Sequence, residues 1–460
     1  MRRRDPASFR DPDGFVFSLD GTLYRSVTPA ARALFIDGKA FFSDAIERGL
    51  LLPFELDADV PKRAATDIGS VIKPETIDVI TYPYEWGFEQ LKDAALNTLD
   101  VNILALKYGL TLKDASAFNI QRHRGATVFI DHTSFEPTDG KLPWHPYSQF
   151  CRHFLNPLVM GSYRDIHAGS FFRIHLDGVP QQIANDFLPW RACFVPSIAM
   201  HMLLHNRFIR RSADIEAKNT GARDISSRGS QLALLKQLRA FVQALKSAKP
   251  VSAWASYYSQ TNYDDTTFAK KKELVAALFA GRRLGIIWDV GANDGTFSRL
   301  VAGSADRVLA LDLDHNAVNA SYVENRQRGD RTLYALVYDV GNPTPALGFE
   351  NAERSTLEQR SKADAVMALA IIHHLSITNN IPLDQSADYF AGRCKELLIE
   401  FVGPGDSQVK RLLAQKNANY DWYTEQNFQA SFSKHFKLEL RHQISDTDRC
   451  VYRFVRLAKS

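Results

Sequence analysis

The sequence predicts an α/β protein with two parts: an α+β domain followed by a Rossmann-like, doubly wound α/β domain. The main observation is that apolar runs of strand length alternate with helix-length segments from residue 286 almost to the end. Such alternation is typical of a parallel sheet covered by helices, with ligands at the carboxyl ends of its strands. The second observation is length, because 460 residues are enough for two or three domains. We place the boundary at Pro250, which gives domains over 1–250 and 251–460.

The composition excludes several classes of protein. The chain carries 56 basic and 52 acidic residues, a net charge of +4, so no nucleic-acid partner is expected. Its four cysteines are scattered without C-x-x-C spacing, which indicates neither a disulfide framework nor a metal site. The basic N-terminus lacks an apolar stretch behind it, and no run of about 18 apolar residues occurs. We therefore expect a cytoplasmic protein without a membrane partner.

The first elements expected are two strands over 15–19 and 22–27, because Asp20 and Gly21 between them are typical of a type I′ hairpin. The same letters, FSLDGTL, are close to the phosphatase signature D-x-D-G-T. Ser18 stands where that chemistry needs an aspartate, so the hairpin is preferred. The remaining elements expected in this half are a helix over 31–52, extended segments over 71–81, and helices over 88–108 and 231–246.

A second informative stretch, LKDASAFNIQRHRGATVFID, places Asn119 five residues after Asp114, and Asp131 twelve residues after Asn119. This spacing resembles the catalytic loop of the small-molecule kinases. The resemblance implies a kinase-like domain in which Asp114 orients a hydroxyl, while Asn119 and Asp131 hold Mg-ATP. The stretch departs from the kinase pattern at Leu112 and Lys113, and no glycine-rich phosphate loop precedes it. Working phosphotransfer and a catalytically silent, substrate-presenting module therefore both remain open.

The stretch IIWDVGANDGTFSRL at 286–300 carries the main functional signal. A strand, a turn with Gly291 and Gly295, and a helix in this order direct backbone N–H groups into a cleft. The glycine spacing differs from the dinucleotide fingerprint, and no Lys–Ser/Thr pair of a P-loop follows. The stretch resembles motif I of class I S-adenosylmethionine (SAM) methyltransferases, in the form D-x-G-x-N-x-G that begins at Asp289 and includes Asn293.

The next strands supply the other cofactor-binding candidates. Asp312 ends the strand over 307–312, seventeen residues after Gly295, where a carboxylate is placed to bind a ribose diol. In the class I fold, Leu313 would pack on the adenine, and Asp339 would meet its amino group. Together with the glycine loop, these residues predict that SAM is the cofactor.

The fourth strand of this half, over 364–370, is followed by His373 and His374. In class I methyltransferases this position borders the transferred methyl group, so an imidazole here is a candidate general base. The alternative is that either histidine only orients the loop. Glu400, on the strand over 396–402, is a weaker candidate for the same role. The other expected elements are strands over 333–338, 437–442 and 450–456, and helices over 295–302, 315–326, 384–394 and 423–435.

Sequence motifs spread over the whole chain resemble those of a bacterial NoeA-like (nodulation-associated) family. They include YPYEW, LKDAS, DVGNPTPALGF and LLIEFVGPGD. The resemblance implies a SAM-dependent methyltransferase joined to a kinase-like N-terminal region. We expect methyl transfer to O or N of a small-molecule or secondary-metabolite acceptor. The alternatives are an ATP-dependent small-molecule phosphotransferase, a bifunctional enzyme, or an N-terminal half that only binds. Composition and motifs specify neither the acceptor nor the oligomeric state.

Overall fold

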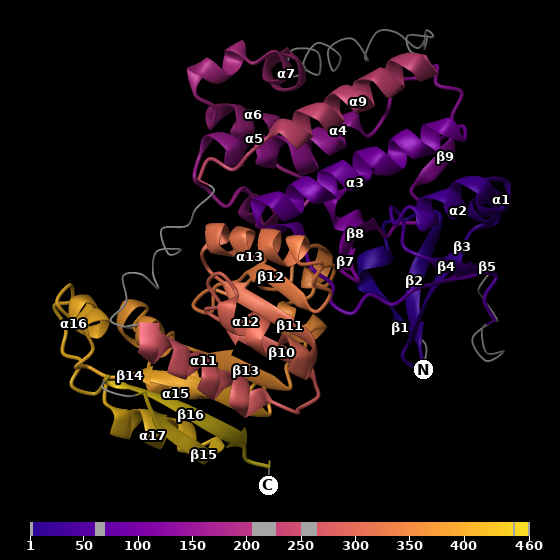
Figure 1. Cartoon of the computed structure of the whole chain (residues 1–460). Helices are drawn as coiled ribbons and strands as arrows, with labels where there is room; N and C mark the ends of the chain where they lie inside the picture. Colours follow the sequence, from indigo (N-terminus) through magenta and orange to yellow (C-terminus); the bar gives the residue numbers. More distant parts are fainter. Residues whose placement is uncertain (1–2, 60–69, 205–226, 250–264, 445–446, 459–460) are drawn as a thin grey trace. The chain divides into compact units, whose positions relative to one another are not determined.

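A computed structural model describes residues 3–59, 70–204, 227–249, 265–444 and 447–458 (Figure 1). The chain forms two compact units. The N-terminal unit comprises Met1–Lys249 together with Ala346–Ser355, and the C-terminal unit comprises Pro250–Pro345 and Thr356–Ser460. The residues that follow the expected boundary, 250–264, lie outside the described part of the chain.

The N-terminal unit begins with a five-stranded antiparallel sheet in the order β1-β2-β3-β5-β4. Its second and third strands form the predicted hairpin. Asp20 and Gly21 between them both adopt left-handed backbone conformations, with φ of 51° and 84°, as a type I′ turn requires. The strands are β1 (Arg3–Arg4), β2 (Gly14–Leu19), β3 (Thr22–Val27), β4 (Phe54–Leu56) and β5 (Ser70–Pro74).

The helix expected over 31–52 is two helices, α1 (Pro29–Asp37) and α2 (Lys39–Glu47), which meet at Gly38. The N–H of Gly38 donates to the carbonyl of Leu34, and a Cβ at this position would lie 2.8 Å from the same oxygen. Glycine, which has no Cβ, therefore allows the two helices to meet this closely. The periodic apolar pattern continues across Gly38, so it did not predict the break.

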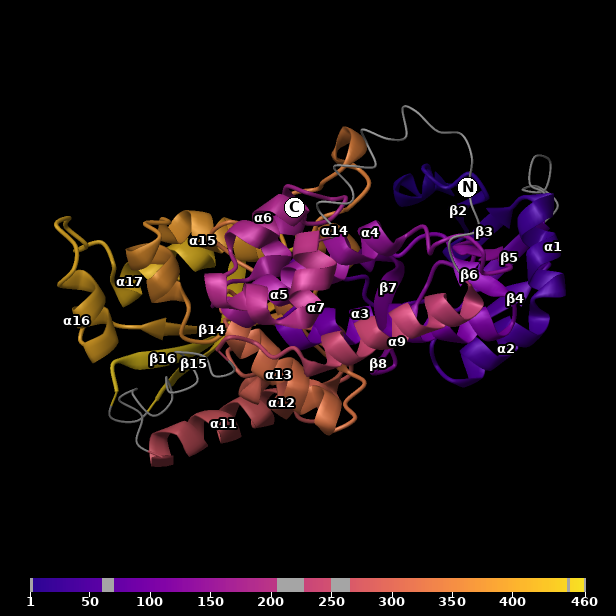
Figure 2. The same cartoon turned by 90° about the horizontal axis from the view of Figure 1, so that it is seen from above.

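The long helix α3 (Phe88–Lys107) is buried over most of its length, and α9 (Arg228–Ala244) packs along it (Figures 1 and 2). After α3 come two small antiparallel pairs, β6 with β9 and β7 with β8. These strands are β6 (Leu110–Leu112), β7 (Ile120–His123), β8 (Ala126–Phe129) and β9 (Phe135–Pro137). The other helices of the unit are α4 (Tyr147–Phe150), α5 (Asn156–Tyr163), α6 (Gln181–Asp186) and α7 (Pro196–Ile198), with π-helices at Cys151–Leu155 and Ala199–Leu204.

The C-terminal unit is built on a seven-stranded sheet in the order β12-β11-β10-β13-β14-β16-β15. The first five strands in this order are parallel, and β16 runs antiparallel to both of its neighbours. The sheet is therefore mixed, whereas a parallel sheet was predicted, because the last two strands form a hairpin. The strands are β10 (Leu284–Val290), β11 (Ala305–Asp312), β12 (Leu333–Val337), β13 (Ala365–Ala368), β14 (Glu396–Val402), β15 (Phe436–Gln443) and β16 (Arg449–Arg456).

Helices cover both faces of this sheet. Alternate strand residues such as Ile287, Leu398 and Val451 share one apolar core with α11 and α12. The opposite face packs against an aromatic cluster that includes Phe390 and Phe428 from α15 and α17. The helices are α11 (Asp265–Phe279), α12 (Thr296–Val301), α13 (His315–Gln327), α14 (Leu357–Arg360), α15 (Leu383–Ala391), α16 (Ser407–Leu413) and α17 (Glu425–Ser433).

None of the helices among the described residues has both the length and the apolar character needed to cross a bilayer.

Candidate functional site

The strand order of the C-terminal unit reverses between β10 and β13, where the chain runs outward in both directions along the sheet. Ligands of doubly wound sheets bind in the crevice at the carboxyl ends of the strands beside such a switch point. The glycine loop follows β10, and the segment with His373 and His374 follows β13. The glycine loop and the two histidines therefore come from the two strands that border this point.

The glycine loop has the backbone shape that its sequence predicts. Gly291 and Gly295 have φ of 76° and 80°, and Asn293 between them is also left-handed at 50°. A Cβ on Gly295 would lie 2.6 Å from Oγ of Ser321, so a larger residue would not fit. The N–H groups of Gly291 and Ala292 both donate to the carbonyl of Leu311, which ties the loop to β11.

Asp312 joins this loop to the next strand. Its Oδ2 accepts the N–H of Asn293 (2.7 Å), and its Oδ1 accepts the N–H of Asp314 (2.8 Å). Burial raises the pKa of Asp312 to about 6. The backbone N–H of Leu313 also stabilises this carboxylate, which can accept about four hydrogen bonds, so it keeps room for a hydroxyl group of a ribose.

Asp289, the first residue of the motif, is buried instead of open to the cleft. Its side chain is 1% exposed, and its Oδ2 accepts a hydrogen bond from Oγ of Ser298 on α12 (2.6 Å). Burial raises the pKa of Asp289 to about 7, and Lys271 on α11 acts in the opposite direction. The carboxyl group is thus held at the base of the loop, and its contact with a cofactor ammonium stays a prediction.

The adenine-binding candidates lie after β11 and β12. Leu313 directly follows Asp312, and it is 65% exposed although it is a large apolar residue. Asp339 shapes the loop after β12, since its Oδ1 accepts the N–H of Gly341 (2.8 Å). A Cβ on Gly341 would lie 2.5 Å from the amide of Asn379, so this loop lies against the segment that follows β13.

These features test whether the site fits SAM, and the residues do fit. A left-handed turn of glycines admits a ligand close to the backbone, an acidic group follows the next strand where a diol would lie, and an exposed apolar side chain stands beside it for a base.

The segment after β13 departs from regular geometry. Ala370 adopts a left-handed conformation (φ 54°), which costs a residue with a Cβ about 1 kcal/mol. A π-helix follows over His374–Thr378. Both features concentrate at functional sites. Ile371 between them lies against Gly291, because a Cβ there would be 3.4 Å from its Cδ1.

His373 is fully buried, and neither of its ring nitrogens has a hydrogen-bond partner within the described part of the chain. Its ring lies 4.2 Å from that of His374, centroid to centroid, and His374 is partly exposed. Burial lowers the pKa of His373 well below its usual value, and the charges of His374, Arg449 and Lys271 act in the same direction. At neutral pH this imidazole is therefore uncharged, and its surroundings disfavour the protonated form.

Glu400 lies in a buried ion network on the face of the sheet that α11 covers. Nζ of Lys271 is 2.5 Å from its Oε2, and a guanidinium nitrogen of Arg449 is 3.5 Å from its Oε1. Arg449 also pairs with Asp406 (2.8 Å), and all four side chains are at most 3% exposed. Glu400 is thus the shared anion of two cations, and its catalytic role stays a prediction.

Sequence reasoning missed Lys271, although a signal was present. Phe268, Lys271, Val275 and Leu278 follow at spacings of three and four residues, so the lysine falls within the apolar stripe of α11. Arg449 is harder to identify from sequence. It lies two residues before Val451 on the same strand, and its pairing with Glu400 depends on the register of β16 against β14.

The kinase-like candidates form a polar cluster in the N-terminal unit. Burial raises the pKa of Asp114, and the neighbouring charge of Asp131 adds to this effect, so the two carboxyls are close together. The amide of Asn119 acts in the opposite direction, which places it beside Asp114. Asp131 is already occupied, because Arg25 on β3 donates to it (2.6 Å). The pKa of Asp131 is lowered against the effect of burial, by Arg25, Ser134 and Thr133.

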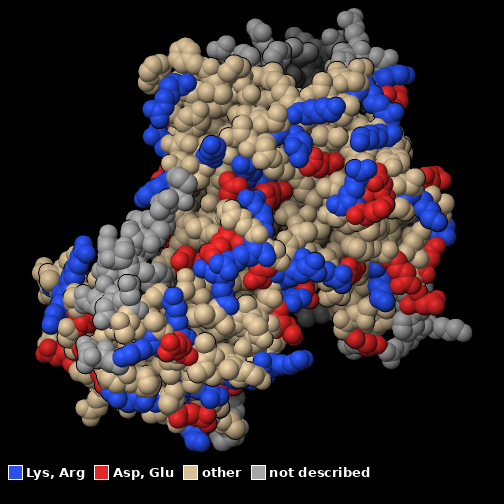
Figure 3. All heavy atoms as spheres, in the orientation of Figure 1, with Lys and Arg blue, Asp and Glu red and all other residues tan. Residues whose placement is uncertain are grey.

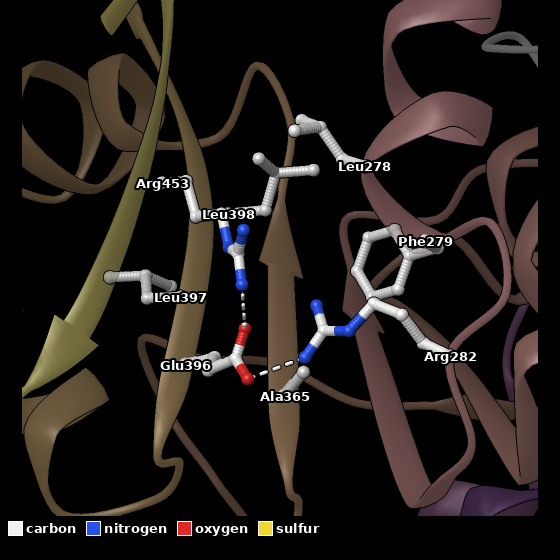
Figure 4. A pocket seen from close by; sticks show the side chains of 8 residues that line it. All are labelled: Leu278, Phe279, Arg282, Ala365, Glu396, Leu397, Leu398 and Arg453. Carbon is white, nitrogen blue, oxygen red and sulfur yellow. Dashed lines mark hydrogen bonds and ion pairs between the residues drawn. The ribbon is translucent and has the colours of Figure 1, made fainter. Parts of the chain in front are cut away.

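A small pocket lies elsewhere on the C-terminal sheet (Figure 4). Glu396 at the start of β14 bonds to both Arg282 and Arg453 there, and Ala365 at the start of β13 lines it. The pocket is therefore at the amino ends of the strands, away from the glycine loop.

No family model matches the chain. The chain is 32% identical over 466 aligned residues to the nodulation protein NoeA of Rhizobium meliloti (strain 1021). The match covers 98% of this chain and 96% of that protein.

The C-terminal region matches solved SAM-dependent methyltransferases. The N-methyltransferase NodS from Bradyrhizobium japonicum WM9 is 13% identical, with a TM-score of 0.31, over 42% of this chain and 98% of that one. Magnesium protoporphyrin IX methyltransferase (ChlM) from Synechocystis PCC 6803, solved with S-adenosylhomocysteine bound, is 14% identical, with a TM-score of 0.32, over 44% of this chain and 93% of that one.

Proposed function

We propose that the chain, which belongs to the family of the nodulation protein NoeA, is a SAM-dependent methyltransferase. The C-terminal unit would transfer a methyl group to an oxygen or nitrogen atom of a small-molecule acceptor. The observation that carries the proposal is the hydrogen bond from the N–H of Asn293 to Asp312. It ties a left-handed glycine loop to an acidic residue at the end of the next strand, as nucleotide-derived cofactors require.

Each residue of the site has a distinct part in this proposal. Gly291 and Gly295 let the cofactor approach the backbone, Asp312 accepts the ribose hydroxyl groups, and Leu313 covers the base. SAM supplies a methyl group on a sulfonium that is already strongly electrophilic. The protein therefore has mainly to align the acceptor, which in favourable cases supplies most of the rate. His373 or its partly exposed neighbour His374 takes the acceptor proton, a contribution of about a hundredfold to ten-thousandfold.

Charge distribution supports a small acceptor rather than a nucleic acid. The numbers of basic and acidic residues nearly balance, at 56 and 52. Figure 3 shows Lys and Arg side chains interspersed with Asp and Glu over the face in view. A nucleic-acid-binding protein would instead gather positive charge along one surface.

The first prediction concerns the cofactor. Asp312→Ala is expected to weaken binding of S-adenosylhomocysteine about tenfold to a hundredfold, because each unpaired polar group costs about 1–3 kcal/mol. Isothermal titration calorimetry of the full chain measures this change. If wild type binds no S-adenosylhomocysteine at high micromolar concentration, the proposed function is wrong.

Asp330→Ala is the matched control for this experiment. Asp330 also accepts two backbone N–H groups, those of Thr332 and Leu333, but at the amino end of β12. Both variants lose backbone hydrogen bonds at the end of a strand, so a loss of stability is expected in each. Affinity should change only in Asp312→Ala, and an equal change in both would show an indirect effect.

A second candidate function concerns the N-terminal unit. We propose that it is kinase-like, since the β6–β9 and β7–β8 pairs hold Asp114, Asn119 and Asp131 in one cluster. Because Arg25 occupies Asp131, we favour a substrate-presenting module over a working phosphotransferase. A bifunctional enzyme is the alternative, and it would need Arg25 to release this carboxylate.

The second prediction follows from that ion pair. Millimolar Mg-ATP is expected to leave the melting temperature of wild type unchanged, because the carboxylate that would hold magnesium is bound to Arg25. A ligand at a hundred times its Kd would stabilise the fold by about 2.7 kcal/mol, a rise of about 5–10 °C. Such a rise in wild type that is lost in Asp131→Asn would contradict the substrate-presenting role and support phosphotransfer.

A further inference from the structure

The connection between β12 and β13 contains a hairpin that folds as part of the N-terminal unit. Ala346–Ser355 belong to that unit, although the chain on both sides belongs to the C-terminal one. Leu347 and Arg354 exchange both backbone hydrogen bonds (2.9 and 3.1 Å). The turn between them contains Gly348, Glu350 and Asn351, all with positive φ. We call residues 347–354 the crossover hairpin.

Specific contacts fix the crossover hairpin within the N-terminal unit. The guanidinium of Arg354 lies 4.4 Å from the ring centroid of Phe118. The carboxylate of Glu353, whose side chain is 6% exposed, pairs with Arg10 (2.7 Å). The side chain of Arg10 is 68% exposed, so this ion pair is weak, and the partly buried cation–π contact of Arg354 is the stronger anchor. The hairpin is therefore held by side chains of its second arm.

The chain segments on the two sides of the hairpin are joined by a hydrogen bond next to Asp339. Tyr338 directly precedes Asp339, and its hydroxyl donates to Glu358 (2.7 Å), which follows the second arm. The first arm reaches the hairpin through the sequence GNPTP, in which Pro343 and Pro345 fix their own φ and restrict the residues before them. Such a linker is stiff, so a change in the hairpin is expected to affect the conformation of the loop that contains Asp339.

We propose that Glu353 and Arg354 are positioning residues for the cofactor: by anchoring the crossover hairpin in the N-terminal unit, they hold the loop of Asp339 in its binding conformation. The proposal rests on the proposed function of this loop. The physical reason is entropic, because a loop that is ordered before binding does not have to be ordered by the ligand. Contacts within the N-terminal unit thereby contribute to cofactor affinity through the covalent connection between the hairpin and the loop of Asp339.

The direct test is Gly348→Ala, which disturbs the hairpin and no residue of the cofactor site. At φ 85°, a Cβ on Gly348 would lie 2.7 Å from Cβ of Glu353. Affinity for S-adenosylhomocysteine, titrated by calorimetry well below the melting temperature, is expected to fall about threefold to tenfold. Gly329→Ala is the control, because Gly329 is also left-handed (φ 65°) but a Cβ there would meet no other atom within 4 Å. Unchanged affinity in Gly348→Ala would overturn the proposal.

A second pair of variants acts from the other side of the contact. Phe118→Leu removes the ring under Arg354 and is expected to weaken binding to the same extent, whereas Phe118→Tyr keeps the ring and should restore it. A merely structural role would lower the melting temperature of Phe118→Leu and leave its affinity unchanged.

Hydrogen exchange of the chain without ligand gives a readout that does not depend on the proposed function. The N–H groups of Gly341 and Asn342 donate to Asp339, and in Gly348→Ala they should exchange about threefold to tenfold faster. If wild type binds no S-adenosylhomocysteine but exchange still accelerates, the proposed function fails while the positioning of the loop stands. If exchange is unchanged, the positioning role is wrong.

Discussion

His373→Asn is expected to lower kcat about a hundredfold or more while leaving S-adenosylhomocysteine affinity nearly unchanged. His373 is uncharged at neutral pH, and its ring nitrogens have no partner within the described residues, so a lone pair is available for the acceptor proton. Turnover can be followed with methyl-labelled SAM and fractionated small-molecule extracts, which also identify the acceptor. A histidine that only packs would instead lower stability, with turnover per folded molecule intact.

The pH dependence of kcat supplies a second criterion for His373. A base works only when it is unprotonated, so activity is lost as the pH falls through its pKa. Burial lowers that pKa well below the usual 6.5. Protonation of His373 should therefore leave kcat at saturating SAM unchanged from neutral pH to below 6.5. A loss of activity centred at or above 6.5 would come from another group: Asp289, whose pKa burial raises to about 7, is one, and His374→Asn tests the neighbouring imidazole.

Glu400→Gln is expected to lower the melting temperature of the C-terminal unit by about 10 °C. Removing one partner of a buried ion pair costs about 3–5 kcal/mol, because the remaining charge stays buried without its counter-charge. Here two cations, Lys271 and Arg449, lose the same anion. Thermal unfolding followed by circular dichroism measures the effect. A shift below about 2 °C with a large loss of turnover would instead favour Glu400 as a catalytic base.

Two further variants support the interpretation of that result. Asp384→Asn breaks an exposed pair with Lys434 (2.8 Å) and should leave the melting temperature nearly unchanged. Combining Lys271→Met with Glu400→Leu removes the buried cation as well as the anion. This double variant should therefore be less destabilised than the sum of its single variants, and additive losses would show that the two side chains do not interact.

Regular elements of the C-terminal unit were predictable from sequence to within a few residues. Strands buried on both faces appear as continuous apolar runs, and β10, β11 and β14 are of this kind. The direction of a strand in the sheet was not predictable, because an apolar run has the same pattern in a parallel and an antiparallel strand. For this reason the antiparallel setting of β16 appeared only in the structure.

The turn of the glycine loop was predictable because it depends on local backbone geometry. Gly291, Asn293 and Gly295 lie within five residues of one another, and the motif alone indicates their turn. The network of Lys271, Glu400 and Arg449 could not be predicted in the same way. Its members come from α11, β14 and β16, and they meet only because the register of the sheet places them on one face.

The crossover hairpin has a consequence for how the protein is made. The N-terminal unit includes Ala346–Ser355, so the ribosome has to synthesise the 96 residues of Pro250–Pro345 before that unit is complete. At about 5–20 residues per second, the delay is roughly 5–20 s. During this time the surfaces around Phe118 and Arg10 emerge without Arg354 and Glu353. A fragment cut at residue 249 would remain permanently in that unfinished state.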